Sequence, residues 1–253
     1  MAKIRRNRAK AKLAAGKVVT ALGNLDDPEW IDHVGHKGFD AIWIEAEHGP
    51  TDYDDVGNLT RACDLWNMSS IVRVGWAQPN LIYRMLDRGA QGIVVPHVNS
   101  RAEAELVVDS VKYAPIGHRG MFHSRQGYGV DDYRARANDE TMIVVLIESI
   151  DAIHNLDDIL EVNHIDAFVV AQHDLAQSMG HVDHHHPEVV QTTYDAIARI
   201  IAAGHVAGTP VHEHDVCKWI EAGVRFCYHS AHEWILDGAD RYLSAVNAAQ
   251  VPD

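Results

Sequence analysis

Two acidic residues, Glu148 and Asp174, are suited by type and spacing to bind a metal ion. Each follows a short apolar run, over residues 142–147 and 167–170. If these runs are neighbouring parallel strands, both carboxylates lie at the same edge of the sheet. Two carboxylates without a nearby thiolate suit a hard cation such as Mg²⁺ or Mn²⁺. The spacing alone also allows two helix N-caps, with Asp174 before a helix start, or two surface salt bridges.

Arg73 lies inside a third apolar run, between Val72 and Val74. A guanidinium does not lose its charge in a protein, so a buried arginine requires an anionic partner. That partner is either the carboxylate or enolate oxygen of a substrate, or a structural carboxylate such as Glu45 or Glu47. The sequence leaves both possibilities open.

His48 follows Glu47 and precedes a Gly-Pro turn. Imidazole titrates near neutral pH, which suits general acid–base chemistry. A carboxylate such as Glu45 or Asp87 could orient the ring. The alternative is an exposed loop histidine, which is the commoner situation.

The elements that must position these residues form a repeating pattern of a short apolar run followed by a longer amphipathic segment. Eight runs are present: residues 18–22, 41–44, 71–74, 92–95, 142–147, 167–170, 205–211 and 226–229. Helices are expected over 54–65, 79–88, 101–113, 152–160, 187–203, 213–222 and 235–249. Four glycines placed to end helices precede strands: Gly38, Gly89, Gly204 and Gly223.

Eight such units in 253 residues predict a single-domain (β/α)8 barrel spanning residues 1–253. A short helix is expected over about residues 3–15, with Ile4, Ala9 and Leu13 facing inward. An open doubly wound sheet is the competing fold, but residues 21–25 lack the glycine-rich turn that it usually carries. Because the polar residues follow the strand ends, charge should converge at one mouth of the barrel. That arrangement predicts a site for a metal ion and an anionic substrate.

Composition limits the partners and the setting. The formal net charge of −14 argues against a nucleic-acid partner. No apolar run reaches the length of a membrane helix, and no signal-peptide pattern is evident. The three cysteines are too scattered for a disulfide framework, which indicates a reducing, cytoplasmic setting.

Histidine is abundant, at 18 residues, and two groups invite a metal interpretation. The first is a tract before a helix start, His181, His184, His185 and His186, which is expected to be a solvated loop. The second, His212 and His214 with His229 and His232, has ligands typical of a zinc hydrolase. In such barrels the His-x-His pair usually ends the first strand, whereas here it ends the seventh, so this interpretation is disfavoured.

Several blocks occur in the same order as in a known family. The chain resembles the HpcH/HpaI aldolase family of class II pyruvate aldolases over residues 39–50, 72–74, 86–96, 113–120, 147–148, 155–157 and 173–180. The resemblance implies a (β/α)8 barrel whose last helix packs on a neighbouring subunit. It also implies a homo-oligomer, either a hexamer or a trimer.

The resemblance implies a role for each matching residue. Glu148 and Asp174 would bind the metal (Mg²⁺ or Mn²⁺, with Co²⁺ possible). Arg73 would bind the 2-oxo acid, together with backbone N–H groups near His173 and Asp174 at a helix start. His48 would be the acid–base residue, assisted by Glu45, and Asp87 would serve the neighbouring subunit's site.

The implied reaction is reversible cleavage of a 4-hydroxy-2-oxo acid through a metal-bound enolate. The products would be pyruvate, or an analogue such as hydroxypyruvate, and an aldehyde. Alternatives are a decarboxylase or citramalyl-type lyase on the same scaffold, for example acting on oxaloacetate, and a non-catalytic binding barrel.

Four departures from the family pattern predict a reshaped acceptor pocket. Glu45 stands where aspartate is usual, and Leu146 where glutamine is frequent. Ala171-Gln172 replaces a Gly-Pro pair, and Met121-Phe122-His123 replaces small residues. These changes leave the metal and oxo-acid residues in place, so they bear mainly on which aldehyde is accepted.

Overall fold

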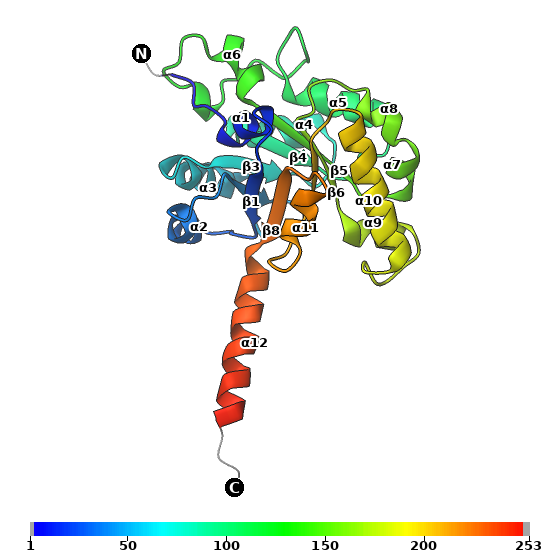
Figure 1. Ribbon diagram of the computed structural model, residues 1–253. Coiled ribbons are helices and arrows are strands. Elements are labelled where there is room, and N and C mark those ends of the chain that lie inside the picture. The colour runs from blue at the N-terminus through cyan, green and yellow to red at the C-terminus, as the bar shows by residue number, and fades with distance from the viewer. Residues whose placement is uncertain (1–2, 250–253) are drawn as a thin grey trace.

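A computed structural model describes residues 3–249 and contains a closed barrel of eight parallel strands (Figure 1). The strands are β1 (Val19–Gly23), β2 (Ala41–Glu45), β3 (Ser69–Arg73), β4 (Gly92–Val95), β5 (Met142–Ile147), β6 (Ala167–Val170), β7 (Ala207–Pro210) and β8 (Phe226–Ser230). Each strand pairs with the next along the chain, and β8 closes on β1. The predicted barrel is confirmed, and the open-sheet alternative is wrong.

The helices surround the barrel and cap one of its ends. They are α1 (Arg8–Ala14), α2 (Pro28–Gly35), α3 (Tyr53–Leu65), α4 (Pro79–Asp87), α5 (Arg101–Val111), α6 (Tyr133–Glu140), α7 (Ile150–His154), α8 (Leu156–Leu160), α9 (Gln172–Ser178), α10 (Pro187–Ala202), α11 (Val216–Glu221) and α12 (Ala231–Ala249), with a 3-10 turn, η1 (Arg125–Gly127). All four glycines predicted to end helices have positive φ angles, between 83° and 110°. Among the described residues, no helix combines the length and apolar character of a membrane span.

The helix predictions need correction in several places. The helix expected over 152–160 is two short helices that meet at Asn155, whose side chain donates to the Asn99 carbonyl. The sequence pattern also missed α2 and α6. α2 begins where Asp27 accepts the Glu29 backbone N–H and a proline follows, which is an N-terminal signal readable from sequence.

Side chains alternate between the inside and the outside of the barrel. On β5, Met142, Val144 and Leu146 belong to the inner cluster, whereas Ile143 and Val145 pack in the outer cluster against the helices. Buried on both faces, the strands carry apolar residues almost throughout, which is why they stood out in the sequence.

The N-terminal helix begins later than the predicted residue 3, at Arg8. Asn7 is the reason, because its side chain accepts the Lys10 backbone N–H and also bonds to the Gln91 and Glu140 carbonyls. Ala9 and Leu13 are buried in the inner cluster, so α1 closes the end of the barrel at which the strands begin.

Lys112 is fully buried near that closed end, after α5. Its ammonium donates to the backbone carbonyls of Asn138 and Thr141, each at 2.7 Å. Burial lowers the pKa of Lys112 to about 7. Lys112 is therefore a structural cross-link between α5 and the start of β5.

We expect Lys112→Met to destabilise the protein by roughly 1–3 kcal/mol, because the Asn138 carbonyl loses this donor and the Thr141 carbonyl keeps only that of Lys10, at 3.0 Å. The effect should depend on pH. Between pH 7 and the ordinary lysine pKa the unfolded chain holds a proton that the folded protein does not, so wild-type stability should rise with pH through this window. Urea unfolding at about pH 6 and about pH 9 measures both effects. Lys37→Met, at an exposed lysine, is the control; a pH dependence that survives Lys112→Met would contradict this assignment.

Candidate active site

A pocket of about 230 Å³ opens at the end of the barrel where the strands terminate. Its wall includes apolar residues from inside the barrel and polar residues that follow the strands. The lining residues are Trp43, His48, Arg73, Leu146, Val169, Ala171, His173, Asp174, Pro210, Val211, His212, Tyr228, His229, Ser230 and Glu233. Four of the predicted site residues, His48, Arg73, His173 and Asp174, therefore share one cavity.

Arg73 is the last residue of β3 and pairs with two carboxylates. Its Nε donates to Glu45 Oε2 at 2.7 Å, and Nη1 lies 3.0 Å from Glu47 Oε2. Both carboxylates are buried, and the guanidinium also lies 5.8 Å from the ring of Trp43. The structural partners that the sequence allowed are thus present. Nη2 makes no hydrogen bond within residues 3–249, which leaves it free for an anion in the pocket.

His48 is 69% exposed, and its ring is not oriented by the expected carboxylates. Glu45 Oε1 accepts the backbone N–H groups of Glu47 and His48, at 2.8 and 3.1 Å, rather than the imidazole. The ring Nε2 instead lies 3.7 Å from Glu47 Oε2. Glu45 therefore fixes the loop that carries His48, and Glu47 is the carboxylate beside its ring.

Glu148 immediately follows β5 and is only 2% exposed. Its Oε1 accepts the His97 backbone N–H at 2.7 Å, and the His97 ring Nδ1 lies 3.2 Å away. Burial raises the pKa of Glu148; His97 opposes this shift, while the negative charges of Asp174 and Glu47 add to it. A buried carboxylate facing other carboxylates is electrostatically unfavourable unless a cation or a proton joins them.

Asp174 lies in the first turn of α9 and lines the pocket. Among the described residues its carboxylate has neither a hydrogen-bond nor an ion-pair partner. The N-cap of α9 is Ala171 and that of α7 is Ser149, so neither Asp174 nor Glu148 is a helix N-cap. Two acidic groups that influence each other, one of them buried, match the oxygen donors that Mg²⁺ or Mn²⁺ prefers.

Asp87 lies apart from the residues that line the pocket. It is the last residue of α4, and its Oδ1 accepts from Arg119 Nη2 at 2.8 Å. Burial raises the pKa of Asp87, while Arg119 opposes the shift. Within its own chain Asp87 therefore holds the 113–125 segment rather than the pocket.

The sequence interpretation missed His97 and assigned Glu47 no role beyond a partner for Arg73. The His97 ring lies between Glu148 and Glu47, with Nδ1 at 3.2 Å from Glu148 Oε1 and Nε2 at 3.7 Å from Glu47 Oε1. It has a positive φ of 55°, which is uncommon for a residue with a side chain. The signal was available, because His97 comes two residues after β4, where chemistry-bearing residues of a barrel are found.

Two of the departures from the family pattern do face the pocket. Leu146 and Ala171 are part of its wall, which makes this side apolar. Met121 and Phe122 are exposed and do not line it. The prediction that position 146 reshapes the pocket is consistent with this geometry, whereas the 121–122 segment lies elsewhere on the surface of the chain.

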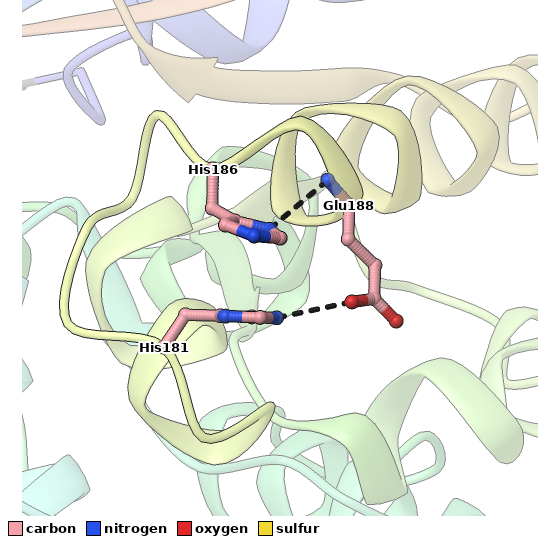
Figure 2. Close-up of side chains that lie close together, drawn as sticks. All are labelled: His181, His186 and Glu188. Carbon is pink, nitrogen blue, oxygen red and sulfur yellow. Dashed lines mark hydrogen bonds and ion pairs between the residues drawn. The ribbon is translucent and has the colours of Figure 1, made fainter.

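The histidine tract forms a loop between α9 and α10, as expected. Figure 2 shows His181 and His186 stacked, with ring centroids 3.8 Å apart, and the His181 ring pointing at Glu188. The Nε2 of His181 lies 3.1 Å from the Glu188 carboxylate, and His186 Nδ1 accepts the Glu188 backbone N–H. His186 therefore caps α10, so this group has a structural explanation.

Comparison with known proteins defines the class. The profile of the HpcH/HpaI aldolase/citrate lyase family matches residues 23–223, and the chain belongs to this family. It is 32% identical to a 2-dehydro-3,6-dideoxy-6-sulfogluconate aldolase of Pseudomonas putida, covering 87% of this chain and 89% of the relative. It is 33% identical to a hydroxypyruvate/pyruvate aldolase of Roseovarius nubinhibens, covering 80% and 81%.

A solved structure agrees with this assignment. An HpcH/HpaI aldolase/citrate lyase family protein of Burkholderia cenocepacia superimposes with a TM-score of 0.88 at 27% identity, covering 95% of this chain and 99% of the other. The predicted family and enzyme class, a carbon–carbon lyase, are confirmed. The zinc-hydrolase and non-catalytic interpretations are wrong.

Proposed function

We propose that this protein reversibly cleaves a 4-hydroxy-2-oxo acid into an aldehyde and pyruvate, or a pyruvate analogue such as hydroxypyruvate. The observation that carries the proposal is the buried carboxylate of Glu148 beside Asp174 at the strand ends, with Arg73 in the adjoining pocket wall. The names of the aldolase relatives support the substrate class.

The residues fit a divalent cation, because two mutually repelling carboxylates gain from an intervening positive charge. Glu148 and Asp174 would hold Mg²⁺ or Mn²⁺, with Co²⁺ a possible substitute. When bound, the cation supplies Lewis-acid polarisation of the 2-oxo group.

The chain's own groups supply the remaining chemistry. Arg73 Nη2 stabilises negative charge that develops on the substrate, and the free N–H groups at the start of α9, near His173 and Asp174, bind its carboxylate. His48, at the mouth, takes the proton from the 4-hydroxyl group of the substrate as that carbon becomes the aldehyde carbonyl and the C3–C4 bond breaks, and it returns the proton in the reverse direction. The apolar wall formed by Leu146 and Val169 excludes water from the carbon that becomes nucleophilic.

Chelation should remove the activity. We expect a retro-aldol assay on a 4-hydroxy-2-oxo acid to lose activity after dialysis against a chelator and to regain it with Mn²⁺ or Mg²⁺. Oxaloacetate decarboxylation, measured in parallel, distinguishes the decarboxylase alternative. Full retro-aldol activity in the metal-free protein would contradict the proposal, and faster turnover of oxaloacetate would favour the alternative.

We further propose that the protein is a homo-oligomer, a hexamer or a trimer, in which α12 packs on a neighbouring copy. Figure 1 shows α12 extending away from its own barrel, and Ala231 is its only buried residue among those described. At 100° per residue, its exposed apolar side chains gather on one side. They are Ile235, Leu236, Tyr242, Leu243 and Val246. Trp234, which is also exposed, lies off this side and packs against Phe39 and His229 of its own barrel.

A matching groove of about 330 Å³ lies beside β1 and β8. Its wall includes Thr20 and Cys227, which are register partners on the two strands, together with Phe39 and Val216. This is where a helix that follows β8 would pack in a barrel. The chain's own α12 contributes only Trp234 to this wall and otherwise leaves the groove open, so a second copy of α12 is the occupant of matching apolar character.

Disrupting the α12 stripe should separate the subunits. We expect Tyr242→Asp with Leu243→Asp to give a monomer by light scattering while the barrel keeps its circular dichroism. Ser244→Asp with Ala248→Asp adds the same charge on the opposite side of the helix and should leave the assembly intact. Equal masses for the two double variants would contradict the proposed interface.

We also propose a cytoplasmic location. All three cysteines are free thiols, with Cys63 and Cys227 buried. Burial raises the pKa of both thiols, which keeps them unreactive. This is the pattern of structural cysteines in a reducing compartment.

A further inference from the structure

A second group of metal-ligating side chains lies at the ends of β7 and β8. His212 follows β7, His229 lies in β8, and Glu233 is in the first turn of α12. One ring nitrogen of each histidine and a carboxylate oxygen of Glu233 lie within 4.8 Å of one another. We propose that His212, His229 and Glu233 form a second divalent-cation site, of the kind that Zn²⁺ prefers.

The hydrogen bonds of His229 leave one nitrogen available as a ligand. Its Nδ1 lies 2.7 Å from the Val211 carbonyl, an acceptor, so Nδ1 carries the proton and Nε2 carries the lone pair. Nε2 is buried and has no hydrogen-bond partner within residues 3–249. Metal-binding histidines commonly donate their other ring N–H to a backbone carbonyl in this way. A buried, unused imidazole lone pair is the strongest single indication of a ligand.

The other two ligands are already held together. His212 Nδ1 lies 2.6 Å from Glu233 Oε2, and the His212 backbone N–H donates to Asp215 Oδ1 at 2.7 Å. The His214 ring stacks on His212 with an interplanar angle of 18°. A cation would replace the proton shared between His212 and Glu233. Glu233 Oε2 now lies 3.9 Å from His229 Nδ1, so its carboxylate would have to shift toward Nε2 for all three to bind one ion.

The donor set differs from that of the Glu148 and Asp174 pair. Two imidazoles and one carboxylate suit a borderline cation such as Zn²⁺, whereas two carboxylates suit Mg²⁺ or Mn²⁺. A set of three protein ligands leaves a fourth tetrahedral position open. His212, His229 and Glu233 all line the pocket, so an oxygen donor there, from water or from a bound acid, would complete the coordination.

The group in Figure 2, formed by His181, His186 and Glu188, is a weaker candidate. His186 Nδ1 already accepts the Glu188 N–H, and Glu188 is exposed. It would nevertheless bind added Zn²⁺ loosely, so the test is made in a protein carrying His181→Ala and His186→Ala, called here the background protein.

Equilibrium dialysis of the background protein against Zn²⁺, followed by metal analysis, tests the proposal. We expect His229→Ala or Glu233→Gln to lose one equivalent of bound Zn²⁺. Asp174→Asn should lose the equivalent bound by Glu148 and Asp174 and keep the one bound by His212, His229 and Glu233. The test of this second site therefore does not depend on whether the proposed function is correct. His214→Ala, a change in the same loop outside the ligand set, should lose nothing.

A spectroscopic measurement, read together with circular dichroism, distinguishes loss of the metal site from poor folding of a variant. Co²⁺ at a site with two imidazoles and a carboxylate should give the visible absorption of four- or five-coordinate cobalt, and the Asp174→Asn protein should retain it. Loss of that absorption in His212→Ala, with unchanged circular dichroism, would support the site. Unchanged Zn²⁺ stoichiometry in His229→Ala and Glu233→Gln, or equal loss in His214→Ala, would overturn it.

Discussion

Replacing Asp174 with asparagine, or Glu148 with glutamine, should lower kcat/KM for retro-aldol cleavage by at least about 1000-fold. That loss corresponds to about 4 kcal/mol of transition-state stabilisation, at 1.36 kcal/mol per factor of ten. Each substitution keeps the shape of the side chain and removes one charge that the proposed cation requires. The expected cause is loss of metal, so bound Mn²⁺ should fall together with activity.

Folding should not suffer in these variants. Because burial and neighbouring carboxylates disfavour the charged form of Glu148, a neutral glutamine in its place should leave the metal-free barrel at least as stable as the wild type. Gln172→Ala, adjacent in α9 but outside the pocket lining, is the matched control and should retain activity. An Asp174→Asn protein with wild-type kcat/KM would exclude this residue as a ligand.

Arg73→Met should affect both activity and stability. We expect kcat/KM to fall by about 100- to 1000-fold, the usual consequence of removing one group that stabilises charge in the transition state. Stability should fall as well, by roughly 3–5 kcal/mol, because the buried carboxylates of Glu45 and Glu47 lose their only guanidinium partner among the described residues.

Arg73→Lys separates the two roles. A lysine ammonium can neutralise Glu45 or Glu47 but cannot reproduce the fork that contacts both and still leaves one nitrogen for the substrate. Its thermal midpoint should therefore recover toward the wild-type value while kcat/KM stays low. If the lysine variant recovers activity together with stability, Arg73 serves only as a structural ion-pair partner. Arg84→Met, on the outside of α4 where the arginine stacks on Tyr53, is the matched control.

The barrel was predictable because its strands are apolar on both faces. Runs such as 142–147 contrast with the amphipathic helices around them, and glycines such as Gly89 and Gly223 mark the helix ends through backbone geometry alone. Helix boundaries were less predictable where a distant side chain sets them. Asn7 delays α1 through bonds to Gln91 and Glu140, and Asn155 divides α7 from α8 through a bond to Asn99.

The residues of the candidate site, like the helix boundaries, could be predicted only in part. The rule that chemistry follows strand ends predicted Arg73, Glu148 and Asp174 as site residues, because each lies at the end of its own strand or within a few residues of it. Arg73 and Asp174 do line one pocket, and the roles of all three stay predictions. The rule could not assign the partner of His48, since whether Glu45 or Glu47 reaches the ring depends on how one loop turns. It also missed the role of His97, whose ring lies between Glu47 and Glu148 only because three strand ends converge.

The sequence by itself thus determined the eight-fold strand and helix pattern, the residues at each strand end and the family, since these depend on local periodicity and order along the chain. Only the tertiary structure decided which charges meet. It placed Arg73 between two carboxylates, sent Asp87 to Arg119, and brought His212, His229 and Glu233 together across β7, β8 and α12. Such contacts depend on distances of a few ångströms in space, and these distances cannot be inferred from the separation of the residues along the chain.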